Sequence, residues 1–160
     1  MIPRFRAWNP HEKKMVDDKE LVIWGGNIYQ GDRQKIFEKI VEGKKGLIGY
    51  SIDDKYLMQS TGLKDKNGTE IFEGDIIATN SFVCIVSFGK YDYFEDDDIK
   101  VTGIGFYLEY LNVEPATYSP FETPFLENCE VLGNIYENEL DLIMYEKWKS
   151  ENPELMEGDE

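Results

Sequence analysis

Few residues of this 160-residue chain have the types and spacing that covalent or acid–base catalysis needs. His11 is the only histidine, and it stands in a polar stretch typical of a turn. Cys84 and Cys129 lie in apolar, strand-like runs, so we expect buried free thiols rather than a Cys–His pair or a disulfide framework. No serine stands in a nucleophile-elbow pattern, and Gly43-Lys44-Lys45-Gly46 lacks the spacing of a phosphate-binding loop. The sequence therefore predicts a protein that is not an enzyme.

The densest group of carboxylates is Glu95-Asp96-Asp97-Asp98. Carboxylate oxygens are the ligands that Ca²⁺ prefers, so calcium is the one metal to test here. Adjacent carboxylates also repel one another, which is typical of a solvated hairpin loop. No cysteine and histidine spacing fits a zinc site. We expect the solvated loop, with no metal and no cofactor, while calcium binding stays an open alternative.

The acidic residues are unevenly distributed along the chain. The 32 Asp and Glu against 17 Lys and Arg give a net charge of −15 at pH 7. Residues 1–50 carry a net +3, residues 51–100 a net −6 and residues 101–160 a net −12. This balance argues against ordinary binding to nucleic acid or to an anionic membrane, because both need Lys and Arg. With 41% hydrophobic and 14% aromatic residues, the chain has enough apolar side chains for a core.

The same asymmetry suggests two further hypotheses. The late carboxylates could imitate the phosphates of DNA on a rigid face and compete for a basic groove. Conversely, the basic N-terminal third could bind nucleic acid itself, with Phe5, Trp8 and Trp24 as stacking platforms. The basic residues that could gather on one side for this are Arg4, Arg6, Lys13, Lys14, Arg33, Lys35, Lys39, Lys44 and Lys45. We prefer the first hypothesis, because the charge of the whole chain opposes the second.

The region 1–55 has the pattern of a β-hairpin followed by one helix. Asp32 is placed to cap an amphipathic helix over residues 32–42, whose apolar side chains recur about one turn apart. β-prone runs separated by turn residues precede this helix. The predicted strands cover residues 4–8, 15–16 and 21–24.

The region 56–138 has the pattern of short strands separated by turns, which is typical of a small barrel or sandwich. Asn67-Gly68 is the strongest short hairpin signal, and residues 104–111 alternate as a half-buried strand does. Residues 89–100 are expected to form a loop. The other predicted strands cover residues 56–59, 70–77, 82–88 and 129–136. The residues expected to fill the barrel are Ile71, Ile76, Val86, Phe106, Val131 and Ile135.

The region 139–160 predicts a helix and an acidic tail. Asn138 is placed to cap the helix, and Pro153 to end it. An apolar stripe is expected on the helix at Leu140, Ile143, Met144 and Trp148. Together with an exposed barrel edge, this stripe could build a homo-oligomer.

Four sequence blocks, in the same order, resemble those of a known family. Residues 4–8 read RFRAW and are followed by KKM at 13–15. Residues 57–68 read LMQSTGLKDKNG, residues 70–77 read EIFEGDII, and residues 130–138 read EVLGNIYEN. In these blocks the chain resembles the YopX-like family of phages and prophages.

This resemblance implies an SH3-like barrel in the second part of the chain and no reaction, because the family has no established biochemical activity. Combined with the patterns above, it predicts an α+β, mainly β protein. Its expected parts are an N-terminal hairpin and helix region over 1–55, the barrel over 56–138, and an acidic C-terminal helix and tail over 139–160.

The function that we expect is protein–protein binding by a non-enzymatic phage or prophage accessory protein. The partner would be a host or phage protein, with no direct nucleic acid binding and no membrane. No secretion segment opens the sequence and no run approaches the about 20 apolar residues of a membrane span, so we expect the bacterial cytoplasm. Aromatic residues anchor interfaces, although these rings could instead cover the barrel's own core. The residues expected to contact the partner are Tyr91, Tyr93, Phe94, Glu95, Asp96, Asp97, Asp98, Tyr118 and Phe121.

Overall fold

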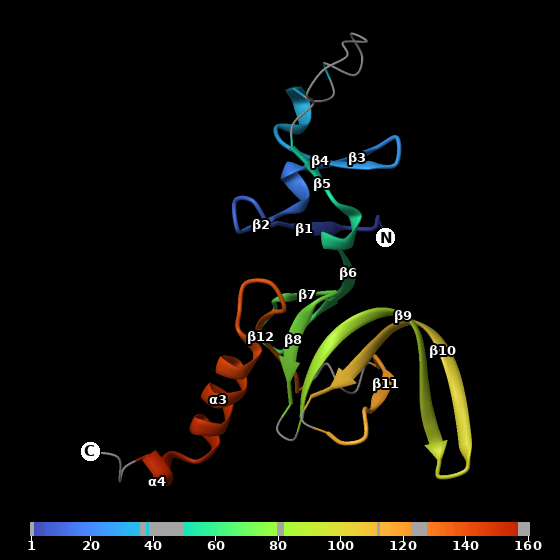
Figure 1. The fold of residues 1–160 in the computed structure, drawn as a ribbon, viewed down its shortest axis with the longest axis vertical. Coiled ribbons are helices and arrows are strands. Elements are labelled where there is room, and N and C mark those ends of the chain that lie inside the picture. Colours follow the sequence, from blue (N-terminus) through green and yellow to red (C-terminus); the bar gives the residue numbers. More distant parts are fainter. Residues whose placement is uncertain are drawn as a thin grey trace. The chain divides into compact units, whose positions relative to one another are not determined.

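The chain folds mainly as antiparallel strands, arranged in two compact units (Figure 1). The computed structural model describes residues 2–35, 38, 50–79, 82–111, 113–122 and 128–156. The units are Met1–Gly62 and Leu63–Glu160, and each contains its own buried apolar cluster. Among the described residues, no helix is long and apolar enough to cross a membrane.

The N-terminal unit holds two small antiparallel sheets. In one sheet, β1 (Phe5–Asn9) lies between β2 (Lys14–Val16) and β6 (Leu57–Lys64). In the other, β4 (Asn27–Gln30) lies between β3 (Leu21–Trp24) and β5 (Tyr50–Ile52). The 3₁₀ turns η1 (Asp18–Glu20) and η2 (Asp54–Tyr56) lead into β3 and β6. The core of the unit consists of Ala7, Val16, Leu21, Ile28 and Ile52.

The predicted strands of this unit are confirmed, and two further strands, β4 and β5, are present. Gly25 and Gly26 have φ of 59° and 79°, as a two-residue hairpin turn requires, and they connect β3 directly to β4. The sequence did not predict β4, because it is four residues long and half polar. The backbone N–H of Lys35 donates to the Asp32 carboxylate at 3.0 Å, which confirms the predicted helix cap. Most of the predicted helix over 32–42 lies outside the described residues.

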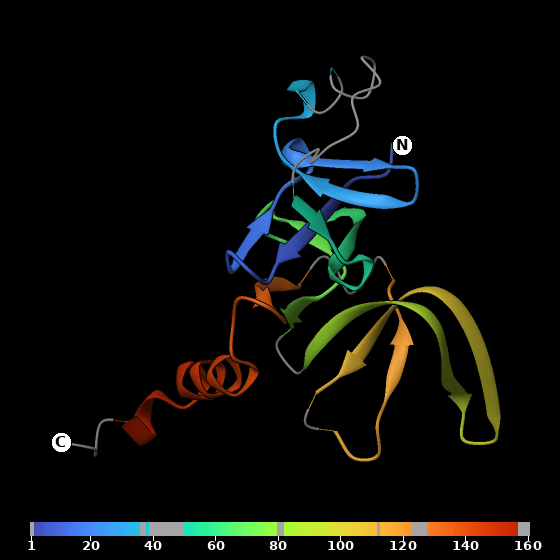
Figure 2. The ribbon, with the colours of Figure 1, turned by 45° about the horizontal axis from the view of Figure 1, so that its top comes forward.

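The C-terminal unit is built on a five-stranded antiparallel sheet that curls into a half barrel (Figures 1 and 2). The spatial order of its strands is β11-β10-β9-β8-β12. These strands are β8 (Asp75–Ala78), β9 (Val83–Asp96), β10 (Ile99–Tyr110), β11 (Tyr118–Pro120) and β12 (Glu130–Asn134). The remaining elements are β7 (Glu70–Phe72), α3 (Leu140–Glu151) and α4 (Pro153–Met156).

Strand β8 lies between two apolar clusters. Successive side chains of a strand point to opposite faces, so Ile77 packs into one cluster and Ile76 into the other. The first cluster contains Ile71, Ile77, Cys84, Val86, Leu108 and Cys129. In the second, Ile143 of α3 packs with Ile76, Ala78 and Val83. The predicted C-terminal helix is therefore present, and it covers one face of β8.

Four predictions around α3 are wrong. The residue that caps α3 is Glu139, without a side-chain hydrogen bond, because the Asn138 side chain instead accepts from the backbone N–H of Asn134 at 3.2 Å. Ile135 was expected to fill the barrel but is 45% exposed, since it follows the end of β12. Pro153 follows the end of α3, as predicted, but the expected tail does not begin directly after it, because Pro153–Met156 form α4. Trp148, expected in the apolar stripe, is also 45% exposed.

The loop predicted over residues 89–100 is also wrong. Strand β9 continues to Asp96 and β10 begins at Ile99, so the turn is two residues long. Gly89 suggested a strand end, but it lies directly opposite Gly105, and the ladder is unbroken there; its one register shift lies near the tip, between Ile99 and Lys100. The φ of these glycines are 147° and 138°, which favour glycine and suit a bent strand.

Candidate functional site

The outer half of the β9–β10 hairpin, Lys90–Ile104, extends beyond the neighbouring strands; we call it the arm (Figures 1 and 2). In β9 only Val83–Ile85 pair with β8, and in β10 only Tyr107–Glu109 pair with β11. In the part of the chain that the structure describes, the strands of the arm therefore pair only with each other. A two-stranded ribbon has no sheet beside it, so both of its faces are open to a partner.

Three tyrosines of this hairpin and one of β11 line the face of the sheet that points away from the core. Val86 and Leu108 are fully buried, so the odd-numbered residues beside them point outward. The tyrosines on that outward face are Tyr91, Tyr93, Tyr107 and Tyr118, and we call their surface the tyrosine face. The ring of Tyr91 stacks on Tyr107 with centroids 4.8 Å apart and on Tyr93 at 5.8 Å. Tyr118 of β11 meets Tyr107 edge-on at 5.9 Å, which completes a continuous row.

A glycine makes room for this row. Gly103 is the direct cross-strand partner of Tyr91. A Cβ atom at Gly103 would lie 2.5 Å from Cζ of Tyr91, so the ring covers the position where a side chain would stand. Tyr91 therefore stacks in its observed place only because residue 103 has no side chain.

The charges on the tyrosine face all have the same sign. Glu109 shares it by strand alternation and lies directly opposite Tyr118, whereas Glu95 lies at the register shift near the tip, beside Tyr93. The Tyr93 hydroxyl donates to Glu95 at 3.4 Å. Partial burial raises the pKa of Tyr93, as do the negative charges of Glu95 and, further away, Glu122. The outward positions of the described strands β9, β10 and β11 contain no Lys or Arg, so this face fits a positively charged partner.

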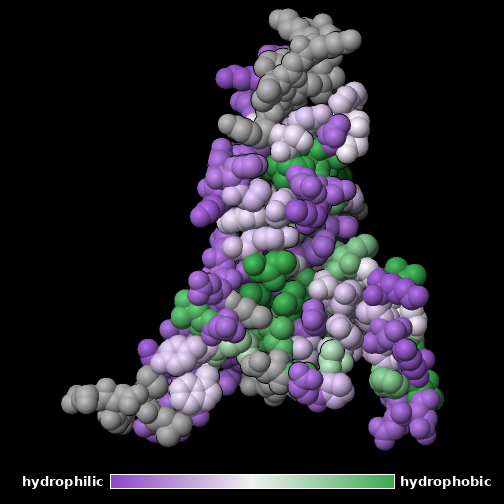
Figure 3. Space-filling view, viewed as in Figure 1, coloured by the Kyte–Doolittle hydropathy of each residue, from purple (hydrophilic) through white to green (hydrophobic). Residues whose placement is uncertain are grey.

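The opposite face of the arm has a different chemistry. Asp92 accepts from the Thr102 hydroxyl at 2.6 Å and forms an ion pair with Lys100 at 3.4 Å. The hydrogen bond from Thr102, aided by the Lys100 charge, lowers the pKa of Asp92. Phe94 and Ile104 on this side are 67% and 83% exposed. In Figure 3 the arm carries both hydrophobic and hydrophilic residues.

The structure separates the residues that the sequence suggested for partner contact. It brings Tyr91, Tyr93, Glu95 and Tyr118 onto the tyrosine face, and it places Phe94 on the opposite face. Phe121 packs against the first core cluster, so its ring covers the core, which was the alternative expected for these aromatic residues. The acidic residues Asp96, Asp97 and Asp98 lie at the tip of the arm, exposed. Sequence reasoning missed Tyr107, Glu109 and Glu122, although the alternation of β10 was the signal for the first two.

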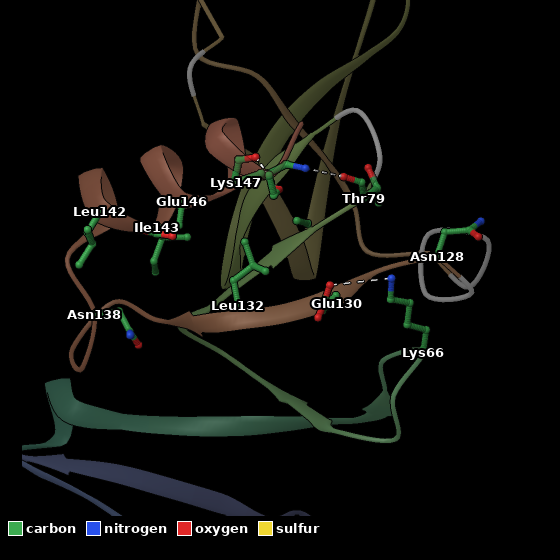
Figure 4. A pocket seen from close by; sticks show the side chains of 12 residues that line it. Lys66, Thr79, Asn128, Glu130, Leu132, Asn138, Leu142, Ile143, Glu146 and Lys147 are labelled. Carbon is green, nitrogen blue, oxygen red and sulfur yellow. Dashed lines mark hydrogen bonds and ion pairs between the residues drawn. The ribbon is translucent and has the colours of Figure 1, made fainter. Parts of the chain in front are cut away.

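A pocket of about 440 Å³ lies between α3 and the β8–β12 side of the sheet (Figure 4). Leu132 and Ile143 line it together with polar side chains. Both lysines of the pocket already have partners within the protein. Lys147 donates to the carbonyl of Thr79 at 3.2 Å, and Lys66 forms an ion pair with Glu130 at 3.8 Å. The pocket is therefore lined by both apolar and polar side chains, and it offers no unpaired lysine charge that would select a ligand.

The residues with catalytic potential do not come together. The His11 backbone N–H donates to the Asn9 side chain in the β1–β2 turn. Cys84 and Cys129 are fully buried free thiols, as predicted. Within the described ranges, no three His, Cys, Asp or Glu side chains form a set that could hold a metal, and this includes Glu95–Asp98.

Basic residues of the N-terminal unit are partly engaged by its own acidic residues. Arg33 pairs with Asp18 at 3.6 Å and also donates to backbone carbonyls, including that of Leu21. Lys14 pairs with Glu20 at 3.7 Å. Lys39, Lys44 and Lys45 lie outside the described residues. Of the proposed stacking platforms, Trp24 is 57% exposed, whereas Phe5 packs against the core.

Comparison with known proteins identifies the family. The family described as YopX protein matches residues 4–141, which is most of the chain. The chain therefore belongs to the YopX family, as its sequence blocks indicated. One solved structure that it matches is the crystal structure of protein EF1440 from Enterococcus faecalis, at 26% identity over 89% of this chain and 99% of that chain, with a TM-score of 0.48. No curated protein matches.

Proposed function

We propose that this protein acts by binding a protein partner, and that its tyrosine face receives a basic surface of that partner. The observation that carries the proposal is the continuous row of four tyrosines on one face of the sheet, with Glu95 and Glu109 beside them and the charge of Glu122 acting on Tyr93. Tyrosines supply rigid contact area at interfaces, and the carboxylates select positive charge.

The wider role that we propose is that of a phage or prophage accessory protein acting in the bacterial cytoplasm without catalysing a reaction. The partner is a host or phage protein. We also propose that the half barrel is an SH3-like barrel, as the family resemblance implies. In such small barrels the scaffold positions a surface, and the surface determines the function.

The test is affinity capture from lysates of a prophage-bearing bacterium, followed by mass spectrometry. The double variant Tyr91→Ala, Tyr93→Ala should retain about a tenth of the captured partner or less, since tyrosine anchors often contribute more than about 1.4 kcal/mol. Phe94→Ala is the matched control, because it removes an exposed ring from the same strand but from the opposite face. Equal capture by the double variant and the wild type would overturn the proposal.

DNA mimicry is the alternative function, and one observation favours it. Asp96, Asp97 and Asp98 are held at the tip of a paired hairpin rather than in a long loop. A basic groove that normally holds phosphates would be a suitable partner for this tip and for the tyrosine face. Competition between this protein and duplex DNA for the captured partner, weakening with added salt, would identify mimicry. Binding that DNA does not displace would support the simple adaptor.

A further inference from the structure

The outer edge of β10, from Ile99 to Gly105, is an unused sheet edge. β11 pairs with β10 only at Tyr107–Glu109, and the other side of Ile99–Gly105 is occupied by β9. In the described chain, no strand occupies the free side of these seven residues. A free edge offers a row of backbone donors and acceptors to a further strand.

This edge lacks the features that usually prevent strand pairing. Proteins protect free edges with prolines and charged residues. Residues 99–105 contain no proline and a single charge, Lys100. The longer run Ile99–Leu108 contains no acidic residue, although the chain carries a net charge of −15. Two copies of this acidic protein can therefore approach along β10 without opposing carboxylates, whereas the free edge of β9 carries Asp92, Glu95 and Asp96.

Exposed apolar side chains accompany the edge. Ile104 is 83% exposed and Ile99 is 52% exposed, and Phe94 beside them on β9 is 67% exposed. An added strand would cover part of this surface and would convert a two-stranded ribbon into a wider sheet. Wider sheets are more stable, because an isolated two-stranded ribbon is marginal in water.

We propose that two copies of this chain pair through Ile99–Gly105, antiparallel, around a twofold axis at Thr102. This register uses the whole free segment, because Thr102 is its central residue. It places Lys100 opposite Ile104 of the second copy and Val101 opposite Gly103 of the second copy, so no like charges face each other. The product is a continuous four-stranded sheet, β9-β10 of one copy followed by β10-β9 of the other. The inference goes beyond the proposed function and leaves the tyrosine face open.

The register gives a charge test. Ile104→Lys places a lysine opposite Lys100 of the second copy, whereas Ile104→Glu places a carboxylate there. Analytical ultracentrifugation over a concentration series should show a dimer for the wild type, since an interface this small gives a weak, concentration-dependent association. Ile104→Glu should remain a dimer, and Ile104→Lys should be a monomer. Ile23→Lys is the matched control, because Ile23 is a 49% exposed isoleucine in β3 of the other unit.

A second measurement does not depend on dissociation. Thr102→Cys brings two thiols together at the twofold axis, where directly paired Cα atoms lie within disulfide distance. Mild oxidation should link this variant into a covalent dimer, and the native Cys84 and Cys129 are too buried to compete. Ile23→Cys should stay monomeric under the same oxidation. A wild-type monomer at every concentration, or a dimer that Ile104→Lys leaves intact, would overturn the inference; loss of partner capture alone would not.

Discussion

Asp65 is the residue whose loss should most affect the C-terminal unit. Asp65 is 7% exposed, and its carboxylate accepts from the backbone N–H groups of Asn67 at 2.9 Å, Thr69 at 2.8 Å and Val131 at 2.9 Å. It thus closes the turn before β7 and ties it to β12. Asp65→Ala leaves three donors without an acceptor, so we expect it to lower the free energy of unfolding by about 2–4 kcal/mol. Urea unfolding followed by circular dichroism measures this change.

The same carboxylate gives stability a defined pH dependence. Burial acts to raise the pKa of Asp65, but the three N–H donors and the Lys66 charge outweigh it, so the pKa is lowered. A lowered folded-state pKa means that the stabilisation is complete above the unfolded-state value, about 4, and is lost as the pH falls through the lower one. The difference between wild type and Asp65→Ala should therefore shrink in acid. Asp98→Ala, at the exposed tip of the arm, should show neither effect.

The thiols of the two cysteines should be unreactive in the folded protein. Burial raises the pKa of Cys84 to about 12, and burial together with the charge of Asp65 raises the pKa of Cys129. A thiol reacts as its thiolate, so neither residue should be alkylated by iodoacetamide at neutral pH, and both should react in urea. Mass spectrometry counts the adducts, with Ser150→Cys on the exposed side of α3 as a reactive control. Rapid native labelling of Cys84 would contradict this packing.

At the scale of elements, the bend of the long hairpin depends on two facing glycines. Gly89 and Gly105 adopt φ of 147° and 138°, and a Cβ atom added at either position would meet no other atom within 4 Å. Alanine there would strain only the backbone, at a cost of about 1–3 kcal/mol for each position. We expect Gly89→Ala and Gly105→Ala to lower the urea midpoint. Gly103→Ala should instead displace the Tyr91 ring, with a change in the near-ultraviolet circular dichroism of tyrosine.

Most strands and the C-terminal helix could be predicted from the sequence, because their apolar residues alternate or recur with a clear period. The arm could not, because Gly89 and the acidic run Glu95–Asp98 have the composition of a loop. Ladder pairing between β9 and β10 overrode that composition. Because the arm was taken for a loop, only part of the candidate site was predicted. Tyr91 and Tyr93 were expected as loop anchors, but only the strand geometry shows that Phe94 faces the other way and that Tyr107 completes the row.

At the scale of the molecule, charge and association are linked. Ten of the 14 acidic residues after position 100 lie in the described part of the chain, so the negative charge belongs largely to the folded unit rather than to its last residues. Such a surface attracts a basic partner and repels a second copy of itself. The two proposed associations therefore use different parts of one hairpin: the acidic tyrosine face for the partner, and the acid-free edge of β10 for the second copy.

This division predicts opposite responses to salt. Added salt shortens the range of charge interactions, so it should weaken partner binding and slow its association. It should also screen the repulsion between two molecules that each carry −15, and so strengthen the dimer. The dimer dissociation constant from ultracentrifugation and the partner affinity from biolayer interferometry, both measured across a sodium chloride series, should change in opposite directions. Sucrose at matched osmolality controls for effects other than screening. A dimer that dissociates as salt rises would be held together by charge attraction. The Ile99–Gly105 edge of β10 has Lys100 as its only charge and cannot provide that attraction, so this result would contradict the proposed interface.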